Sequence, residues 1–321
     1  MKRVAIVAAL CLLAFVCVLC GCSGPSGPGA PGMATTAKKP EPPPPDPPPS
    51  TSSKIAFQRY MGTKGRERGT WQIFSINTDG TGEQKLTSGT SINQKPSWGP
   101  DGRIAFTSNR DGQRRLYTMD SDGSNQEALT SPPAGNPGDN APDVCPCDAG
   151  KVAFVRNREG TASYSDIWIV ADGTETQLTT GPLRDEWPSF SPNGTFVVFN
   201  RKDTEGEAGQ LCVVHAAGGT PWVLVEGTYP EWSPDGSSIV YYSQADAWTI
   251  AVNETTGEAT GAPVPVTDDD TAVREYGPTW APLGDFIAYW TGSYEIAIRE
   301  LGAGATALTE GEFPDWSPDV F

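Results

Sequence analysis

The sequence predicts an all-β protein, a six-bladed β-propeller with four-stranded blades. Two observations predict this fold: a phrase close to Pro-x-Trp-Ser-Pro-Asp-Gly occurs six times in the 321 residues, and a short apolar strand follows most copies. The first prolines of the phrases are separated by 46, 46, 42, 48 and 36 residues, at Pro96, Pro142, Pro188, Pro230, Pro278 and Pro314. A repeat of about 45 residues with short strands between turns is typical of a propeller.

Each repeat contains the segments for four strands. The phrase itself supplies the first. The apolar second strands are expected at residues 55–57, 104–106, 152–154, 196–199, 239–242 and 286–289. Third strands are expected at residues 72–76, 116–119, 167–170, 211–214 and 248–251, and fourth strands end in Leu-Thr pairs such as Leu86-Thr87. Strands of this length between turn residues fit one propeller blade.

The two ends of the repeat region complement each other. The first apolar strand, at Ile55, has no phrase before it, and the last phrase, at Trp316, has no strand after it. An all-β ring needs every edge to be paired. We therefore expect the propeller to span residues 54–321 and to be closed by the C-terminal strand.

The residue types in the phrase have clear structural uses. Pro-Asp-Gly favours a tight turn, because proline presets φ and glycine adopts the left-handed region. The tryptophan is large enough to fill the space between neighbouring blades. Most of the ten tryptophans in the chain are therefore expected to be packing residues.

The phrase also resembles a known repeat. The copy Pro230-Glu231-Trp232-Ser233-Pro234-Asp235-Gly236 is similar to the TolB-type β-propeller repeat, and the resemblance covers the whole region expected to fold. It implies a WD-like propeller of the kind found in extracytoplasmic proteins of the cell envelope. It does not define an activity, because propellers carry many functions.

The N-terminus predicts export and a lipid anchor. Residues 1–21 have the charged start and apolar core of a signal peptide. They lead into Leu19-Cys20-Gly21-Cys22, which resembles a bacterial lipobox, so we expect lipidation at Cys22. Residues 22–53 are rich in proline and are expected to form a disordered spacer. The protein is then held on the outer face of the bacterial cell membrane or on the outer membrane, with the periplasm as one possible compartment.

Charge excludes one class of partner. The chain has a formal net charge of −16, and removal of residues 1–21 takes away Lys2 and Arg3, which gives 21 − 39 = −18. Phosphate backbones are bound by basic patches. Nucleic acid is therefore not an expected partner, and the excess of acid favours solubility; a monomer is expected.

The sequence leaves a disulfide open and gives little support for a metal or a cofactor. Cys145, Cys147 and Cys212 remain after processing, and a disulfide among them is left open. With a single histidine in the chain, no metal site is expected. A cation at acidic loops such as residues 268–270 is also left open, and no cofactor is expected.

No sequence motif predicts catalysis. His215 is the only histidine, and a nucleophile elbow, an HExxH motif and a phosphate loop are all absent from the sequence. We therefore expect no enzyme, but a module that binds an envelope protein, a peptide or a glycan. The alternative is a propeller-type hydrolase or lyase with its site at the channel mouth.

The binding site is expected where several repeats meet. Residues that immediately precede the inner-strand prolines should surround the central channel, where loops on a rigid scaffold commonly bind ligands. The candidate binding residues are the aromatics Trp187, Tyr229, Tyr276 and Phe313 and the acids Asp185, Glu186, Glu275 and Glu312. An aromatic and acidic mouth suits a peptide, a sugar or a cationic group.

Overall fold

A computed structural model gives the fold and describes residues 53–62, 69–159, 164–203, 209–266, 275–301 and 305–318. The chain divides into two units, Met1–Asp46 and Pro47–Phe321, and every described strand lies in the second. The signal peptide, Cys22, the spacer up to residue 52 and the acidic loop 268–270 lie outside the described residues. Within the described part, no helix has the length and apolar character needed to cross a membrane.

Hydrogen bonding places the strands in five sheets. The first has the order β24-β1-β2-β3, with bounds Glu312–Trp316, Lys54–Met61, Thr70–Asn77 and Gln84–Lys85. The next contains β4 to β7, with bounds Asn93–Trp98, Ile104–Ser108, Arg115–Met119 and Glu127–Ala128. Another contains β16 to β19, with bounds Thr228–Trp232, Ser238–Ser243, Asp246–Ala251 and Val264–Pro265. A further sheet contains β20 to β23, with bounds Glu275–Trp280, Phe286–Thr291, Glu295–Glu300 and Ala305–Glu310.

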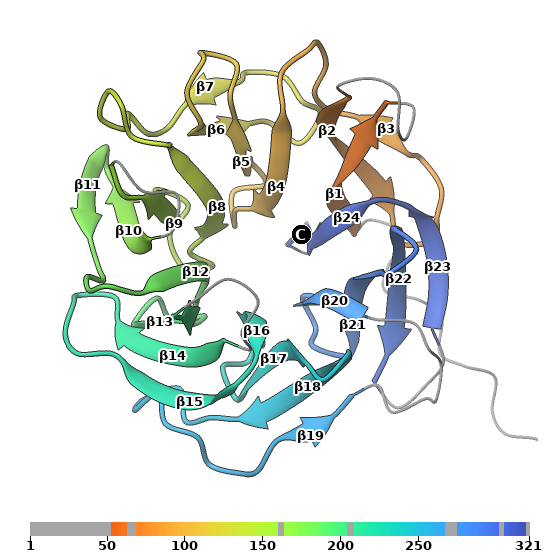
Figure 1. The fold of residues 1–321 in the computed structure, drawn as a ribbon. Helices are drawn as coiled ribbons and strands as arrows, with labels where there is room; N and C mark the ends of the chain where they lie inside the picture. Colours follow the sequence, from red (N-terminus) through yellow and green to blue (C-terminus); the bar gives the residue numbers. More distant parts are fainter. Residues whose placement is uncertain are drawn as a thin grey trace, which may run out of the picture. The chain divides into compact units, whose positions relative to one another are not determined.

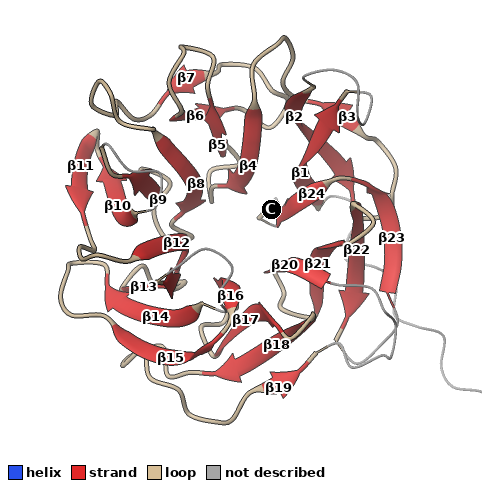
Figure 2. Ribbon diagram, viewed as in Figure 1, coloured by secondary structure: helices blue, strands red, loops and turns tan. Residues whose placement is uncertain are grey.

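The largest sheet has eight strands. Its first half contains β8 to β11, with bounds Asp139–Val144, Lys151–Asn157, Ser165–Ala171 and Thr174–Gln177. Its second half contains β12 to β15, with bounds Arg184–Phe190, Phe196–Lys202, Gln210–His215 and Trp222–Glu226. The sequence correctly predicted an all-β propeller of repeated antiparallel strands (Figure 2).

The strands surround a central axis. Figure 1 shows β4, β8, β12, β16, β20 and β24 nearest the centre, and we call these the inner strands. Each inner strand contacts the next, from β24 through β4, β8, β12, β16 and β20 and back to β24. Residues from all six inner strands line a pocket at this axis, which we call the end of the central channel, so distant repeats come together there.

The prediction of six separate four-stranded blades is wrong as stated. Four sheets have four strands each, whereas the remaining eight strands form one sheet. A parallel bridge between Ser165 on β10 and Arg184 on β12 joins its two halves. The Ser165 hydroxyl also donates a hydrogen bond of 2.9 Å to the Asp185 carbonyl, which holds the two strands together at this corner.

The predicted closure by the C-terminal strand is also corrected. β24 pairs only with β1, at Ile55 with Trp316, Ala56 with Asp315 and Gln58 with Glu312, and so completes a single sheet. Neighbouring sheets do not meet through backbone pairing of β24. They meet through side chains that pack between sheets and through side-chain hydrogen bonds across the inner strands, described below.

The core is distributed between neighbouring sheets. In one cluster, Ala56 and Ile73 of the first sheet pack against Trp98 and Phe106 of the next. In another, Ile55 and Trp316 pack against Phe286. The tryptophans of the repeated phrase lie in these clusters, as their size predicts.

Replacing Trp316 tests how much the last described strand contributes to stability. Trp316 is 5 % exposed and packs with Ile55 and Phe286. Trp316→Ala should lower the free energy of unfolding by about 3–5 kcal/mol, because it leaves a large cavity in the core. Urea unfolding measures this change. Leu283→Ala is the control, because Leu283 is 72 % exposed and its truncation should change stability by less than about 0.5 kcal/mol. Equal stability of the two variants would contradict a packing role for β24.

Candidate functional site

The residue before each inner-strand proline has an unusual backbone conformation. All six of these residues have positive φ: Lys95 (54°), Ala141 (47°), Trp187 (56°), Tyr229 (53°), Gly277 (54°) and Phe313 (51°). Residues other than glycine rarely adopt this left-handed region, because Cβ crowds the following carbonyl. The same left-handed geometry on every inner strand therefore marks a repeated structural device, strained at the five residues that are not glycine.

A β-bulge accompanies each of these residues. The pairing register shifts between Gln94 and Ser97 on β4, and between Glu186 and Ser189 on β12. A bulge re-aims a side chain out of the regular alternation of a strand. Here it directs the residue before the proline into a pocket at one end of the channel, which all six of these residues line.

Aromatic rings fill this end of the channel. The Trp187 ring stacks on Phe313 at 5.0 Å between centroids and lies 4.5 Å from Tyr229. Trp290 connects the other side, at 5.5 Å from Phe313 and 4.5 Å from Tyr276. We call the six aromatic residues of this cluster the aromatic mouth: Trp187, Tyr229, Tyr242, Tyr276, Trp290 and Phe313.

The four aromatic residues selected from the sequence thus come together, and their role in binding stays a prediction. Sequence reasoning missed Tyr242 and Trp290, which lie on β17 and β21 rather than on inner strands. Strand register could have found Trp290, because it pairs directly with Tyr276. Tyr242 stacks on Tyr276 at 4.8 Å.

The four acidic residues selected from the sequence have different surroundings. Asp185 is buried and accepts two hydrogen bonds of 2.7 Å from Arg201. Glu186 forms ion pairs of 2.8 Å with both Arg184 and Lys202.

Glu312 is buried and accepts a hydrogen bond of 3.2 Å from the Gln58 side chain. The side chain of Glu275, at the start of β20, lies outside the described part. Basic side chains therefore oppose the charge of Asp185 and Glu186, so the mouth is less acidic than the sequence predicts.

A lysine lies against the aromatic mouth. The Lys95 ammonium is 3.9 Å from the centroid of the Trp187 ring and 5.7 Å from that of Phe313, which is cation–π geometry. The side chain is half-buried at the surface of the mouth. Loss of hydration in these surroundings lowers the pKa of Lys95 to about 7, although the nearby charge of Glu186 raises it.

Deeper in the channel, polar side chains follow the prolines. Asp143, Glu231 and Asp315, which we call the channel acids, come directly after prolines on β8, β16 and β24. The equivalent positions on the intervening inner strands carry the hydroxyl residues Ser97, Ser189 and Thr279. Acid and hydroxyl therefore alternate around the channel.

These side chains join neighbouring inner strands. At five junctions the side chain accepts a hydrogen bond from a backbone N–H on the next inner strand, and we call this contact the inter-strand clasp. The donors and acceptors are Trp98 N and Asp315 Oδ2 (2.6 Å), Val144 N and Ser97 Oγ (3.0 Å), Phe190 N and Asp143 Oδ2 (2.8 Å), Trp232 N and Ser189 Oγ (3.2 Å), and Trp280 N and Glu231 Oε1 (2.9 Å).

The channel acids favour their protonated forms. Each retains some surface, but this surface faces the channel that the protein encloses. Loss of hydration raises the pKa of Asp143 and Glu231 well above the usual range, and the charge of Asp315 adds to both shifts. The pKa of Asp315 is raised to about 7 by the same loss of hydration, against the hydrogen bonds from Trp98 and Thr279.

The other reactive groups lie elsewhere. The His215 ring is exposed on β14 and packs 4.5 Å from Phe196. Cys145, Cys147 and Cys212 are free thiols, with the sulfurs of Cys145 and Cys147 2.8 Å apart. Within the described ranges, no three histidine, cysteine, aspartate or glutamate side chains are grouped so that they could hold a metal ion.

Comparison with known families identifies the repeat. The TolB beta propeller domain family matches residues 61–226, which is more than half of the chain. The chain belongs to the TolB β-propeller family. The repeated strands of its propeller agree with this family.

Relatives with curated names cover parts of the chain. The uncharacterized peptidase YuxL of Bacillus subtilis is 34% identical over 129 residues, which is 37% of this chain and 20% of YuxL. The Tol-Pal system protein TolB of Anaeromyxobacter dehalogenans is 33% identical over 128 residues, which is 39% of this chain and 28% of that TolB. The chain thus spans less than a third of the length of these two relatives.

Solved structures share the fold. TolB from Acinetobacter baumannii superimposes with a TM-score of 0.67 at 21% identity, over 85% of this chain and 68% of that TolB. The Kuenenia stuttgartiensis hydrazine synthase gives a TM-score of 0.66 at 13% identity, over 83% of this chain and 46% of its own. Both are similar in architecture alone.

Replacing Asp315 tests the raised pKa in the channel. A carboxyl whose pKa is raised from 3.8 in the unfolded chain to about 7 in the folded protein adds to the free energy of unfolding. This contribution is complete below pH ~4. That contribution is lost as the pH rises to about 7. Asp315→Asn keeps an acceptor for the Trp98 N–H and cannot titrate. The variant should flatten the dependence of unfolding free energy on pH between 5 and 7 by up to about 1.4 kcal/mol per pH unit.

Urea unfolding across pH 4–8 measures this slope. Asp235→Asn is the matched control, because hydrogen bonds from Ser233 and Ser237 lower the pKa of Asp235, so its titration falls below this range. Parallel slopes for the wild-type protein and Asp315→Asn would contradict the raised pKa.

Proposed function

We propose that this chain is a lipid-anchored, extracytoplasmic binding protein whose aromatic mouth holds an extended segment of an envelope protein. The observation that carries the proposal is the repeated bulge, which brings aromatic side chains from separate sheets to one end of the channel. Bulges that hold residues in strained backbone conformations are common at functional sites. Stacked aromatic rings are the side chains that most often anchor a protein partner.

The relatives support a protein partner. One named relative is a component of the Tol-Pal system, and a TolB-like propeller is in general a protein-binding module. A peptide that crosses the mouth would cover Trp187 and Phe313 and gain apolar contact with both rings. We propose an envelope location on the same basis.

Binding without catalysis fits the chemistry of the channel. One oxygen of each channel acid accepts a backbone hydrogen bond from the next inner strand. These carboxyls therefore attach neighbouring inner strands to one another. The alternative, a hydrolase or lyase at the mouth, draws on the relative named as an uncharacterized peptidase.

Peptide selection on the full chain tests the site. Random peptides displayed on phage and selected on the purified protein should include binders that Trp187→Ala weakens tenfold or more, because truncation of a central aromatic anchor commonly costs about 2 kcal/mol. Affinity is measured by isothermal titration calorimetry. Trp222→Ala is the matched control, since Trp222 lies on the outer strand β15.

Two outcomes would overturn this site. Selected peptides that lose affinity in Trp222→Ala and not in Trp187→Ala would move the working surface away from the mouth. Cleavage of the selected peptides by the purified protein would support the enzyme alternative instead.

The lipid anchor is tested by labelling. In cells supplied with a clickable fatty acid, the wild-type protein should carry the label and fractionate with membranes. Cys22→Ala should carry no label, because the thiol that accepts the lipid is absent, and should leave the membrane fraction. Cys212→Ala is the control, since Cys212 is buried in the propeller. Unchanged labelling of Cys22→Ala would contradict the anchor.

A further inference from the structure

A second cavity lies beside the aromatic mouth. Its volume is about 300 Å³, and it shares Lys95, Ala141 and Trp187 with the pocket at the end of the channel. Charged walls are provided by Lys95, Arg114, Arg184 and Glu186, and amide groups by Asn140 and Asn157. We call this cavity the cationic pocket.

The pocket is positive in a protein that is strongly negative. Its lining contains three basic side chains and one acid, so its formal charge is 3 − 1 = +2, whereas the chain has a net charge of −16. Glu186 is already paired with Arg184 and with Lys202, which lies next to it. The excess positive charge therefore belongs to Lys95 and Arg114.

These two cations have donors available for a ligand. Within the described residues, the Lys95 ammonium has only aromatic faces as close partners. The Arg114 guanidinium forms no ion pair or side-chain hydrogen bond within the same ranges. Buried or half-buried cations without an oxygen partner are costly, and an anion in the pocket would supply one.

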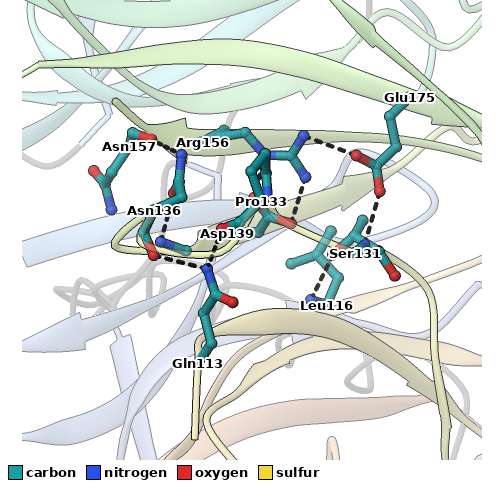
Figure 3. Close-up of polar contacts among 11 residues, drawn as sticks. Gln113, Leu116, Ser131, Pro133, Asn136, Asp139, Arg156, Asn157 and Glu175 are labelled. Carbon is teal, nitrogen blue, oxygen red and sulfur yellow. Dashed lines mark hydrogen bonds and ion pairs between the residues drawn. The ribbon is translucent and has the colours of Figure 1, made fainter. Parts of the chain in front are cut away.

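Hydrogen bonds outside the pocket hold one of its walls in place. The Asn136 side chain donates a hydrogen bond of 2.6 Å to the Asn157 carbonyl and accepts one of 2.7 Å from the Gly138 N–H. Gln113 donates to the Asn136 carbonyl at 2.7 Å (Figure 3). The Arg156 guanidinium donates hydrogen bonds of 2.6 and 2.8 Å to the Asp139 carboxylate. Pro137 and Asn140 lie within this supported segment, so the pocket does not depend on a loose loop.

The Asn157 side chain adds a polar group to the pocket. Its backbone carbonyl takes part in the network, whereas its amide makes none of the contacts drawn in Figure 3. Asn140 uses its side-chain oxygen to accept from Thr107 at 3.2 Å, which leaves its NH₂ group as a donor. The pocket thus combines fixed cations with amide donors, the arrangement that selects a small oxyanion.

We infer that the cationic pocket binds a carboxylate, and that in the protein's partner this carboxylate belongs to a peptide lying across the aromatic mouth. The second half of this inference rests on the proposed function. The carboxylate would lie between the Lys95 ammonium and the Arg114 guanidinium, while an apolar part of the same ligand contacts Trp187. The two cavities share Lys95, Ala141 and Trp187, so a single ligand can contact both.

A monoanion suits the site better than a dianion. The field of a strongly negative protein opposes each added negative charge, and Glu186 lines the pocket itself. A phosphate dianion meets this repulsion twice. A carboxylate is also matched by the planar fork of an arginine.

Small probes test the pocket directly. Hydrocinnamate, which joins a phenyl ring to a carboxylate, should bind the full chain in calorimetric titration at pH 6, and its uncharged amide should not. Arg114→Gln should weaken hydrocinnamate about tenfold or more, because charge-assisted hydrogen bonds are lost. Arg115→Gln is the matched control, since Arg115 is the next residue, does not line the pocket and pairs with Asp111 instead.

The pH dependence has a defined sign. The pKa of Lys95 is about 7, with Glu186, Arg114, Arg184 and Lys202 as the charged groups around it. The probe is ionised throughout, because carboxylic acids titrate near pH ~4. Affinity should therefore fall as the pH rises from 6 to 9, and Lys95→Met should remove most of this fall.

Each outcome decides the inference. Equal affinity for hydrocinnamate and its amide, or an equal effect of Arg114→Gln and Arg115→Gln, would overturn it. Tighter binding of phenylphosphonate than of hydrocinnamate would overturn the assignment to a carboxylate.

Peptides separate this inference from the proposed function. Selected peptides that depend on Trp187 are tested in two altered forms. A C-terminal amide shows whether the bound carboxylate is the C-terminus, and Glu→Gln or Asp→Asn changes show whether it is a side chain. Peptides insensitive to both changes would leave the aromatic mouth in place and overturn the carboxylate subsite. Binding of hydrocinnamate that depends on Arg114, without any selected peptide, would support the pocket and contradict the peptide site.

Discussion

The inter-strand clasp is the contact on which the ring depends. A backbone N–H on one inner strand points toward the channel, where no strand partner is available for it. The side chain after the preceding strand's proline accepts this hydrogen bond, through a carboxyl at some junctions and a hydroxyl at others. Because an unpaired buried N–H costs about 1–3 kcal/mol, the acceptor side chain after the proline stabilises each of these five junctions.

The clasp and the bulge both involve the residues next to each inner-strand proline. The bulge places the residue before the proline at the mouth, and the residue after it faces the next strand. The proline between them lacks an N–H, so it leaves no donor unsatisfied at this irregular point. Three successive residues thus supply pocket lining, backbone rigidity and sheet-to-sheet attachment. Strain in the left-handed residue is tolerated because its neighbours on both sides are fixed.

Much of the fold could be predicted because the sequence that forms it repeats. Six phrases and their following strands predicted the propeller and the face that carries the aromatic mouth. The single eight-stranded sheet could not be predicted, because one parallel bridge at Ser165 and Arg184 creates it. Such a contact depends on the local approach of two strands and leaves no periodic signal.

The clustering of the aromatic side chains was predictable where position alone decides it. Trp187, Tyr229 and Phe313 precede prolines, and the ring brings them together. Trp290 joined them through strand register, which needs the pairing partner to be known. The charge of the mouth was harder to predict, because Arg184 and Lys202 neutralise Glu186. Composition does not show which charged side chains pair between neighbouring strands.

The alternation of acid and hydroxyl around the channel has an evolutionary consequence. The chemical unit of this ring is a pair of neighbouring repeats, twice the length of the sequence repeat, since each carboxyl is flanked by two neutral side chains. Loss of one hydroxyl-bearing repeat would place two carboxyls on adjacent inner strands, where each would raise the pKa of the other and ionisation of both would oppose assembly. Gain or loss of repeats in pairs would preserve the pattern. The channel therefore constrains how a gene for such a ring can lengthen or shorten by duplication and deletion.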